Sequence, residues 1–114
     1  MATTLVEIDT GALRQKIDSG APPVLVDALS LISYAASHLP GAINIPPERV
    51  DDLAPRHLPD LDAEIVVYCA SPTCMSSVEV AERLTELGYT RVRHYAGGKR
   101  DWVEAGLPLE GGRA

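Results

Sequence analysis

Short runs of apolar and β-branched residues alternate along the chain with stretches of helical spacing, and Gly and Pro separate the two kinds of segment. The apolar runs lie at residues 5–8, 24–26, 43–45, 65–68 and 92–95. Strands that alternate with helices are typical of a parallel sheet covered by helices. The pattern therefore predicts an α/β fold in which helices cover a parallel central sheet of about five strands.

The first helix is expected to start near Thr10 and to stop at Gly20. Its spacing directs Leu13 and Ile17 toward the core. A second, short helix is expected near residues 32–36.

Pro and Gly limit two further helical segments. Residues 48–53 have helical spacing, and we expect Pro55 and Pro59 to break up the segment that follows. A last helix is expected to open at Gly97 and Gly98, to carry Trp102 and Val103 and to end at Gly106.

The clearest strand and the clearest helix stand on either side of a short loop. Residues 65–68 are apolar throughout, which favours a central place in the sheet, and Cys69 stands at the carboxyl end of this strand. In the helix after the loop, Ser76 and Glu79 have capping-box spacing and Gly88 supplies the stop. The residues that share its apolar face are Val80, Ala81, Leu84 and Leu87.

The chain length, the net charge and the length of the apolar stretches exclude several classes of function. The 114 residues fit one domain spanning residues 1–114, of which residues 110–114 are expected to form a loose tail. The net charge is −6 and no Lys or Arg cluster offers a site for nucleic acid. No apolar stretch is long enough to cross a bilayer, and residues 1–7 lack the features of a signal peptide. We therefore expect a cytoplasmic protein with no nucleic-acid or membrane partner and with reduced thiols.

Cys69 is the candidate nucleophile. Ligands of open α/β sheets bind at the carboxyl ends of strands, and backbone amides at a helix N-terminus lower the pKa of a nearby thiol. The amides of residues 70–75 could form such a nest around Cys69. On the local pattern alone, Cys69 could equally well continue a buried strand, because free Cys is among the most buried residue types.

Several blocks of the sequence resemble the rhodanese family, at the right spacing and in the right order. The strand at residues 24–27 ends in Asp27 and is followed by Tyr34 and by a Pro-Gly block at residues 37–46. Residues 65–69 resemble the active-site strand of that family. The C-terminal signature is matched by residues 87–89, Val92, Tyr95, Gly97, Gly98, Trp102 and residues 106–108.

This resemblance implies a rhodanese-like fold, which is a parallel central sheet with helices on both faces. It also implies a sulfurtransferase activity in which Cys69 accepts a sulfur atom as a persulfide. It implies a substrate-binding loop consisting of Ala70, Ser71, Pro72, Thr73, Cys74, Met75 and Ser76. The donor would be a small-molecule or protein-bound sulfane sulfur, and the acceptor a thiol or a cyanide-type nucleophile. No metal or organic cofactor is expected, because two cysteines without further nearby ligands do not make a zinc site.

Departures from the family pattern affect the choice of substrate. Cys74 stands where many single-domain rhodaneses have Arg, Met75 stands where Ser is common, and Leu29 replaces a frequent Arg. A dianion usually needs a bidentate Arg. We therefore expect thiosulfate to be a poor donor, and the same lack of Arg argues against a related phosphatase activity.

The remaining candidates have two interpretations each. Cys74 could resolve an oxidised or persulfidated Cys69, or it could simply pack at the helix entry. Asp27 and His38 are possible supporting residues, more as turn or loop supports than as catalytic groups. Ser71 and Ser76 could donate hydrogen bonds to a persulfide, although capping would explain Ser76.

The sequence thus favours a sulfurtransferase or sulfur carrier that uses a Cys69 persulfide. Two alternatives remain open. One is a non-catalytic sulfur-relay or protein-interaction module, which the uncharged loop would suit. The other is a thiol redox sensor that uses Cys69 and Cys74.

Overall fold

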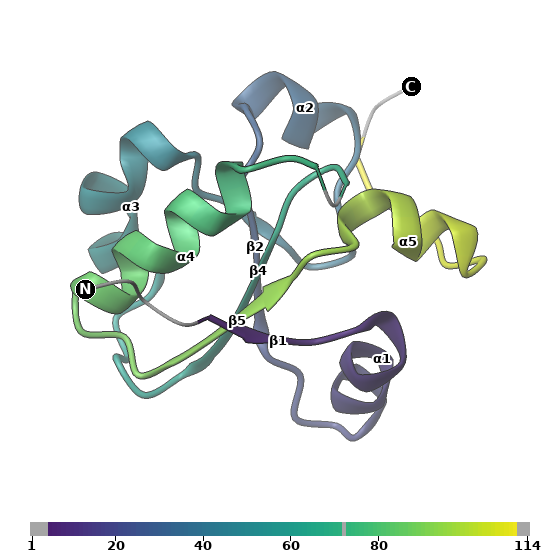
Figure 1. The fold of residues 1–114 in the computed structure, drawn as a ribbon, viewed down its shortest axis with the longest axis horizontal. Helices are drawn as coiled ribbons and strands as arrows, with labels where there is room; N and C mark the ends of the chain where they lie inside the picture. The colour runs from purple at the N-terminus through teal and green to yellow at the C-terminus, as the bar shows by residue number, and fades with distance from the viewer. Residues whose placement is uncertain (1–4, 72, 112–114) are drawn as a thin grey trace.

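The computed structural model describes residues 5–71 and 73–111, and it contains a parallel sheet of five strands (Figure 1). The order of the strands across the sheet is β1-β5-β4-β2-β3, and every neighbouring pair is parallel. This confirms the predicted α/β fold. The strands are β1 (Val6–Glu7), β2 (Val24–Asp27), β3 (Ile43–Asn44), β4 (Glu64–Tyr68) and β5 (Arg91–Tyr95).

Helices cover both faces of this sheet, as predicted (Figure 1). One face carries α3 (Val50–His57) and α4 (Ser76–Glu86), and the other carries α1 (Thr10–Asp18) and α5 (Gly98–Glu104). The short α2 (Leu31–Ala36) follows β2 and lies beyond the carboxyl end of the sheet (Figure 1).

The two cores follow from the alternation of side chains along the strands. On β4, Ile65 and Val67 face α3 and α4, whereas Val66 and Tyr68 face α1 and α5. All four side chains are fully buried, because β4 is a central strand and helices cover both faces of the sheet at this place. The alternation places Cys69 on the α4 side of the sheet.

Two local expectations are wrong. Pro55 does not break the helix that precedes it but lies inside α3. In a helix the amide of residue 55 would donate to the carbonyl of Asp51, but Pro55 has no N–H. Asp51 is exposed, so water can bond to its carbonyl instead. Ser76 does not cap α4: Met75 takes that position in an α-helical conformation, with no side-chain cap.

The chain end is tied to the Pro-Gly block. The amides of His38 and Glu110 each donate to the carbonyl of the other, at 2.9 and 2.8 Å. The predicted tail therefore begins with an anchored residue, and residues 112–114 lie outside the described part of the chain. Among the described helices, none combines the length and hydrophobicity needed to cross a bilayer.

Candidate active site

Cys69 occupies the carboxyl end of the central strand, directly after Tyr68. The N-terminus of α5 holds its backbone, because the amide of Lys99 donates to the Cys69 carbonyl at 3.0 Å and that of Arg100 to the Ala70 carbonyl at 3.0 Å. Gly98 makes this approach possible: its φ is +62°, and a Cβ at this position would overlap the Cys69 carbonyl oxygen. The Gly97 and Gly98 pair thus fixes the start of the loop.

The Cys69 thiol is buried and hydrogen-bonded. Its Sγ lies 3.1 Å from the Ser77 hydroxyl and 3.3 Å from the Cys74 carbonyl oxygen, and the residue is only 2% exposed. Burial raises the pKa of the Cys69 thiol, and the nearby Cys74 side chain raises it further, while the hydroxyl and amide of Ser77 oppose the rise. The free protein therefore favours the thiol form of Cys69.

Cys74 lies beside Cys69 in the loop. Burial opposes ionisation of its thiol, but the interaction with the Cys69 thiol and the amides of Ser76 and Ala70 outweigh this and lower the pKa of Cys74. Of the amides of residues 70–75 that were expected around Cys69, the Ala70 amide acts on Cys74 instead, and the backbone amide that favours the Cys69 thiolate is that of Ser77. Because the two thiols interact, ionisation of one thiol makes ionisation of the other less favourable.

The other loop residues divide into a polar turn and a helix entry. The Cys74 amide donates to the Ser71 carbonyl at 3.1 Å, and the hydroxyls of Ser71 and Thr73 lie 3.1 Å apart on the surface. The Ser76 side chain contributes to the lowered pKa of Cys74. Met75 is 60% exposed, and Pro72 lies outside the described residues.

Asp27 supports the neighbouring strand ends rather than the thiol. Its carboxylate accepts from the Leu29 amide at 2.9 Å and from the Tyr68 hydroxyl at 2.8 Å. The Tyr68 oxygen in turn accepts from the Leu39 amide at 2.9 Å. Burial raises the pKa of Asp27, and these hydrogen bonds only partly offset it. Asp27 therefore links β2, β4 and the Pro-Gly block.

His38 is likewise a support. Its Nδ1 lies 2.8 Å from the Tyr34 carbonyl oxygen, and its ring stacks on that of Tyr34 with centroids 4.0 Å apart. The Tyr34 hydroxyl donates to the Ala42 carbonyl at 2.6 Å. None of the hydrogen bonds of His38 in the described part of the chain reaches Cys69.

Sequence reasoning missed the two polar groups behind Cys69. Ser77 and His94 are 1% and 6% exposed, and the Ser77 hydroxyl lies 2.8 Å from His94 Nε2. A signal was present: His94 is two residues after Val92 on a strand, so both side chains point to the same, buried face. A polar residue at a core-facing position is informative.

Two cationic side chains on the helices beside the loop, Lys99 and Arg83, are engaged elsewhere. The Lys99 ammonium lies 3.4 Å from the Ser33 carbonyl oxygen on α2, and Lys99 acts electrostatically on Asp27. Arg83 is bound to both carboxylate oxygens of Asp51, at 2.7 and 2.8 Å. The guanidinium of Arg83 is therefore held on the surface between α3 and α4, away from the loop.

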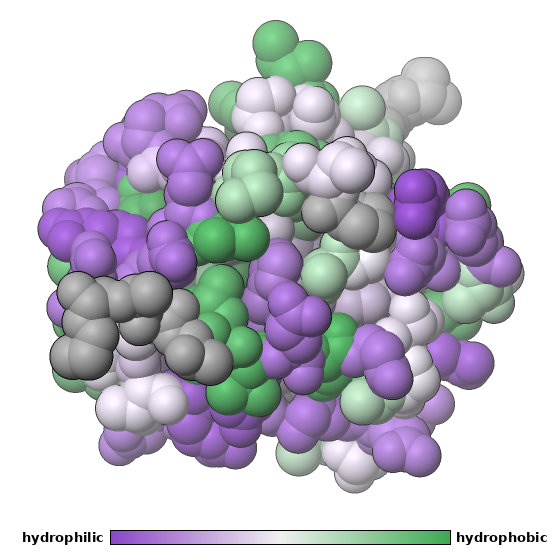
Figure 2. Space-filling view, viewed as in Figure 1, coloured by the Kyte–Doolittle hydropathy of each residue, from purple (hydrophilic) through white to green (hydrophobic). Residues whose placement is uncertain are grey.

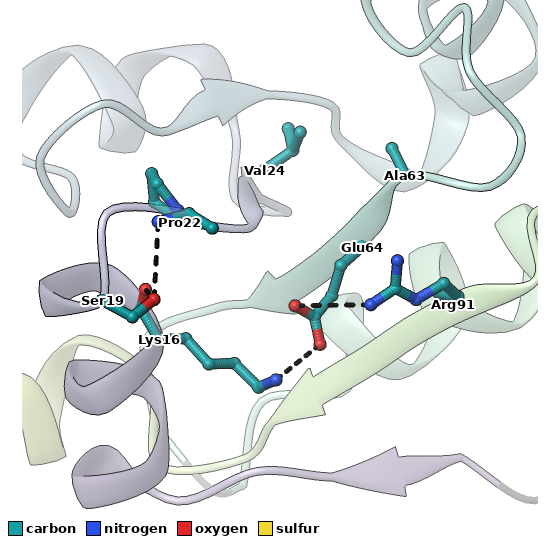
Figure 3. A pocket seen from close by; sticks show the side chains of 8 residues that line it. Lys16, Ser19, Pro22, Val24, Ala63, Glu64 and Arg91 are labelled. Atoms are coloured by element: carbon teal, nitrogen blue, oxygen red, sulfur yellow. Dashed lines mark hydrogen bonds and ion pairs between the residues drawn. The ribbon is translucent and has the colours of Figure 1, made fainter.

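A polar pocket lies at the amino end of the sheet, opposite to the end that carries Cys69 (Figure 3). Its centre is Glu64, the first residue of β4, which forms ion pairs with Lys16 at 2.9 Å, Arg93 at 3.4 Å and Arg91 at 4.0 Å. Cys69 follows the last residue of the same strand. This pocket is therefore separated from the thiols by the length of β4.

Comparisons with known proteins agree with this geometry. The family model of the rhodanese-like domain matches residues 9–105. The putative sulfur carrier protein YrkF of Bacillus subtilis is 31% identical over 102 residues, which are 90% of this chain and 53% of YrkF. The thiosulfate:glutathione sulfurtransferase of Homo sapiens is 32% identical over 104 residues, which are 81% of this chain and 88% of that protein.

The fold is also shared with solved structures. The crystal structure of the BH2092 protein from Bacillus halodurans matches with a TM-score of 0.85 at 28% identity, over 93% of this chain and 77% of that chain. The chain spans 38 to 62% of the length of several curated relatives that it matches, YrkF among them. The family model, the relatives and the sheet topology agree, and the chain therefore belongs to the rhodanese-like family.

Proposed function

We propose that this protein is a sulfurtransferase or sulfur carrier that holds a sulfane sulfur on Cys69 as a persulfide. The observation that carries the proposal is the place of Cys69 at the carboxyl end of the central strand, with its Sγ 3.1 Å from the Ser77 hydroxyl. Ligands of parallel sheets bind at this edge. The sulfurtransferase and sulfur-carrier relatives support the same chemistry.

The proposed reaction has two steps. In the first, the Cys69 thiolate attacks the sulfane sulfur of the donor, a Cys69 S–S bond forms, and the donor leaves with the electron pair of its broken bond. In the second, an acceptor thiolate or cyanide attacks the outer sulfur, and the Cys69 thiolate leaves. No external oxidant or reductant is needed, because the sulfur atom moves with its oxidation state unchanged. A reducing compartment such as the cytoplasm would keep both thiols available for it.

The loop suits uncharged or protein-bound donors better than thiosulfate. No Lys or Arg stands between Cys69 and Ser76, and Arg83 and Lys99 are engaged elsewhere. Exposed apolar side chains occur at the carboxyl end of the sheet, namely Met75 in the loop and Leu31 and Ile32 on α2, and Figure 2 shows hydrophobic surface over α2. These residues favour a protein as donor or acceptor, which also suits a relay module with slow turnover.

A redox-sensor function is the second candidate, and one observation favours it. The Cys69 Sγ lies 3.3 Å from the Cys74 carbonyl oxygen, and each thiol shifts the pKa of the other. Oxidation of either thiol would place a sulfenic acid next to a second cysteine, which can condense with it to a disulfide and release water.

Intact-protein mass spectrometry separates the candidates. The protein is treated separately with a persulfide donor, with thiosulfate and with peroxide, beside Cys69→Ser and Cys74→Ser variants. A sulfurtransferase gains the mass of one sulfur atom from the persulfide donor in the wild type and in Cys74→Ser, but not in Cys69→Ser. A sensor gains no stable sulfur and loses two hydrogens with peroxide. Uptake of sulfur by Cys69→Ser equal to that of the wild type would refute the assignment to Cys69.

A further inference from the structure

Four polar side chains form a chain of contacts from the buried thiol toward the surface. The Cys69 Sγ lies 3.1 Å from Ser77 Oγ, and Ser77 Oγ lies 2.8 Å from His94 Nε2. On the far side of the ring, His94 Nδ1 lies 3.4 Å from a carboxylate oxygen of Glu7. These residues come from the end of β4, from α4, from β5 and from β1.

The chemistry of the groups fixes the direction of these hydrogen bonds. The Glu7 carboxylate can only accept, so Nδ1 of His94 carries a proton and Nε2 is left as an acceptor. The Ser77 hydroxyl then donates to Nε2, and its oxygen is free to accept from the Cys69 thiol. Every donor in the chain thus points away from the sulfur and toward Glu7.

The three groups nearest the thiol end of this chain of contacts are buried. Cys69, Ser77 and His94 are 2%, 1% and 6% exposed, whereas the Glu7 side chain is 66% exposed. A buried hydroxyl and a buried imidazole cost free energy unless they are hydrogen-bonded. Within residues 5–71 and 73–111, the side chains that hydrogen-bond to the Ser77 hydroxyl are those of Cys69 and His94.

We propose that Ser77 and His94 form a proton relay that activates Cys69, with Glu7 orienting the imidazole. This inference rests on the proposed function, since it supplies the thiolate that the first step needs. The Cys69 proton moves to Ser77 Oγ while the Ser77 hydroxyl proton moves to His94 Nε2. The products are a Cys69 thiolate and an imidazolium, so charge is conserved and no redox partner takes part. The Ser77 hydroxyl and amide then donate to the thiolate.

The relay explains how a thiol in this position becomes reactive. Burial by itself disfavours the Cys69 thiolate, and an imidazolium held behind Ser77 offsets this penalty by its positive charge. Among residues 5–71 and 73–111, the titratable groups in contact with the relay are Glu7 from β1 and Cys74 from the loop. Because Cys74 is a competing proton acceptor, it must be removed before the relay is measured.

The test therefore uses a Cys74→Ser parent in which Cys69 is the only cysteine. With cysteine labelled by carbon-13 at Cβ, nuclear magnetic resonance follows the ionisation of Cys69 directly, whatever its exposure. Four variants are made in this parent: Ser77→Ala, His94→Gln, the double variant with both changes, and His57→Gln. Each is compared with the parent. His57 is an exposed residue at the end of α3 and serves as the matched histidine control.

We expect Ser77→Ala and His94→Gln each to raise the titration midpoint of Cys69 by about one pH unit. The double variant is expected to shift no further than the larger single shift, because both changes break one path. His57→Gln is expected to leave the midpoint in place. An unchanged midpoint in Ser77→Ala, or shifts that add in the double variant, would overturn the relay.

Two further measurements keep the outcomes distinct. Thermal unfolding of each variant shows whether it folds; if His94→Gln does not, Ser77→Ala decides, since it removes one oxygen atom only. Sulfur uptake by the Cys74→Ser parent is read by mass in the same samples. Absence of uptake by the wild type and by the Cys74→Ser parent alike refutes the proposed function, while the titration still decides the relay.

Discussion

Gly98 lies directly against the backbone of Cys69, so that a Cβ on residue 98 would overlap the Cys69 carbonyl oxygen. The contact joins the N-terminus of α5 to the start of the loop, where the Lys99 amide donates to the same carbonyl. Gly98 also has a φ of +62°, which other residues adopt only with strain.

Substitution of Gly98 by Ala is therefore expected to damage both stability and sulfur transfer. Strain and overlap should cost about 2–4 kcal/mol in the free energy of unfolding, and displacement of Cys69 should slow persulfide formation about tenfold or more. Gly106→Ala is the matched control, since Gly106 has a φ of +82° but open space around its Cβ position. It should lose stability while transfer by the folded protein is unchanged. Equal transfer rates in the two variants would contradict the role of the contact.

Substitution of Cys74 by Ser should leave persulfide formation intact and weaken protection against oxidation. Cys74 contacts the Cys69 thiol and can condense with a sulfenic acid formed there. Peroxide should therefore convert Cys69 to sulfinic acid faster in the variant than in the wild type, as measured by peptide mass spectrometry. Loss of persulfidation would place Cys74 in the transfer step itself, and equal oxidation rates would reduce it to a packing residue.

Substitution of Cys74 by Arg should improve thiosulfate as a donor. It introduces a guanidinium at the end of an uncharged loop, and charge-assisted hydrogen bonds to a dianion are strong. We expect cyanide-coupled turnover with thiosulfate to be weak in the wild type and the Michaelis constant to fall about tenfold in the variant. Cys74→Gln serves as an uncharged control of comparable length. A Michaelis constant that is unchanged, or equally lowered by Gln, would contradict this prediction.

Asp27 is expected to make stability fall as the pH rises above the acid range. Burial raises its pKa above the ordinary 3.8, so the folded state binds this proton more tightly than the unfolded state. The contribution of Asp27 to stability is therefore fully present below pH 3.8, declines up to the raised pKa and is constant above it. Asp27→Asn should lack this decline in denaturant unfolding measured at several pH values. A parallel pH dependence in variant and wild type would argue against it.

The contribution of Glu64 to stability depends on pH in the opposite direction to that of Asp27, and Glu64 lies at the other end of β4 from the thiols. The interaction with Lys16 lowers the pKa of Glu64, burial opposes this, and the charges of Arg91 and Arg93 add to the lowering. Its stabilisation is therefore present above the ordinary pKa of 4.5 and is lost as the pH falls through the lowered value. Glu64→Gln should cost about 1–2 kcal/mol at pH 7 and less in acid. Its sulfur uptake should equal that of the wild type, and a slower uptake would show that the two ends of β4 are coupled.

The local pattern of the sequence was sufficient for the architecture. Buried parallel strands read as continuous apolar runs, and residues 65–68 gave both the strand and its central place. Gly88 and Gly106, with positive φ, mark helix ends that the pattern predicted. The pattern failed at Pro55, which lies inside α3, and at Ser76, because Met75 takes the cap position of α4.

The sequence by itself determined that Cys69 stands at the end of a central strand, because strand periodicity and the loop that follows are local properties. Only the tertiary structure decided which groups surround its sulfur. Glu7 and His94 are 87 residues apart, and His94 is 17 residues from Ser77. They meet because β1 pairs with β5 and α4 packs beside them. The same packing turned the amides of Ala70 and Ser76 toward Cys74, since a loop's direction depends on what it packs against.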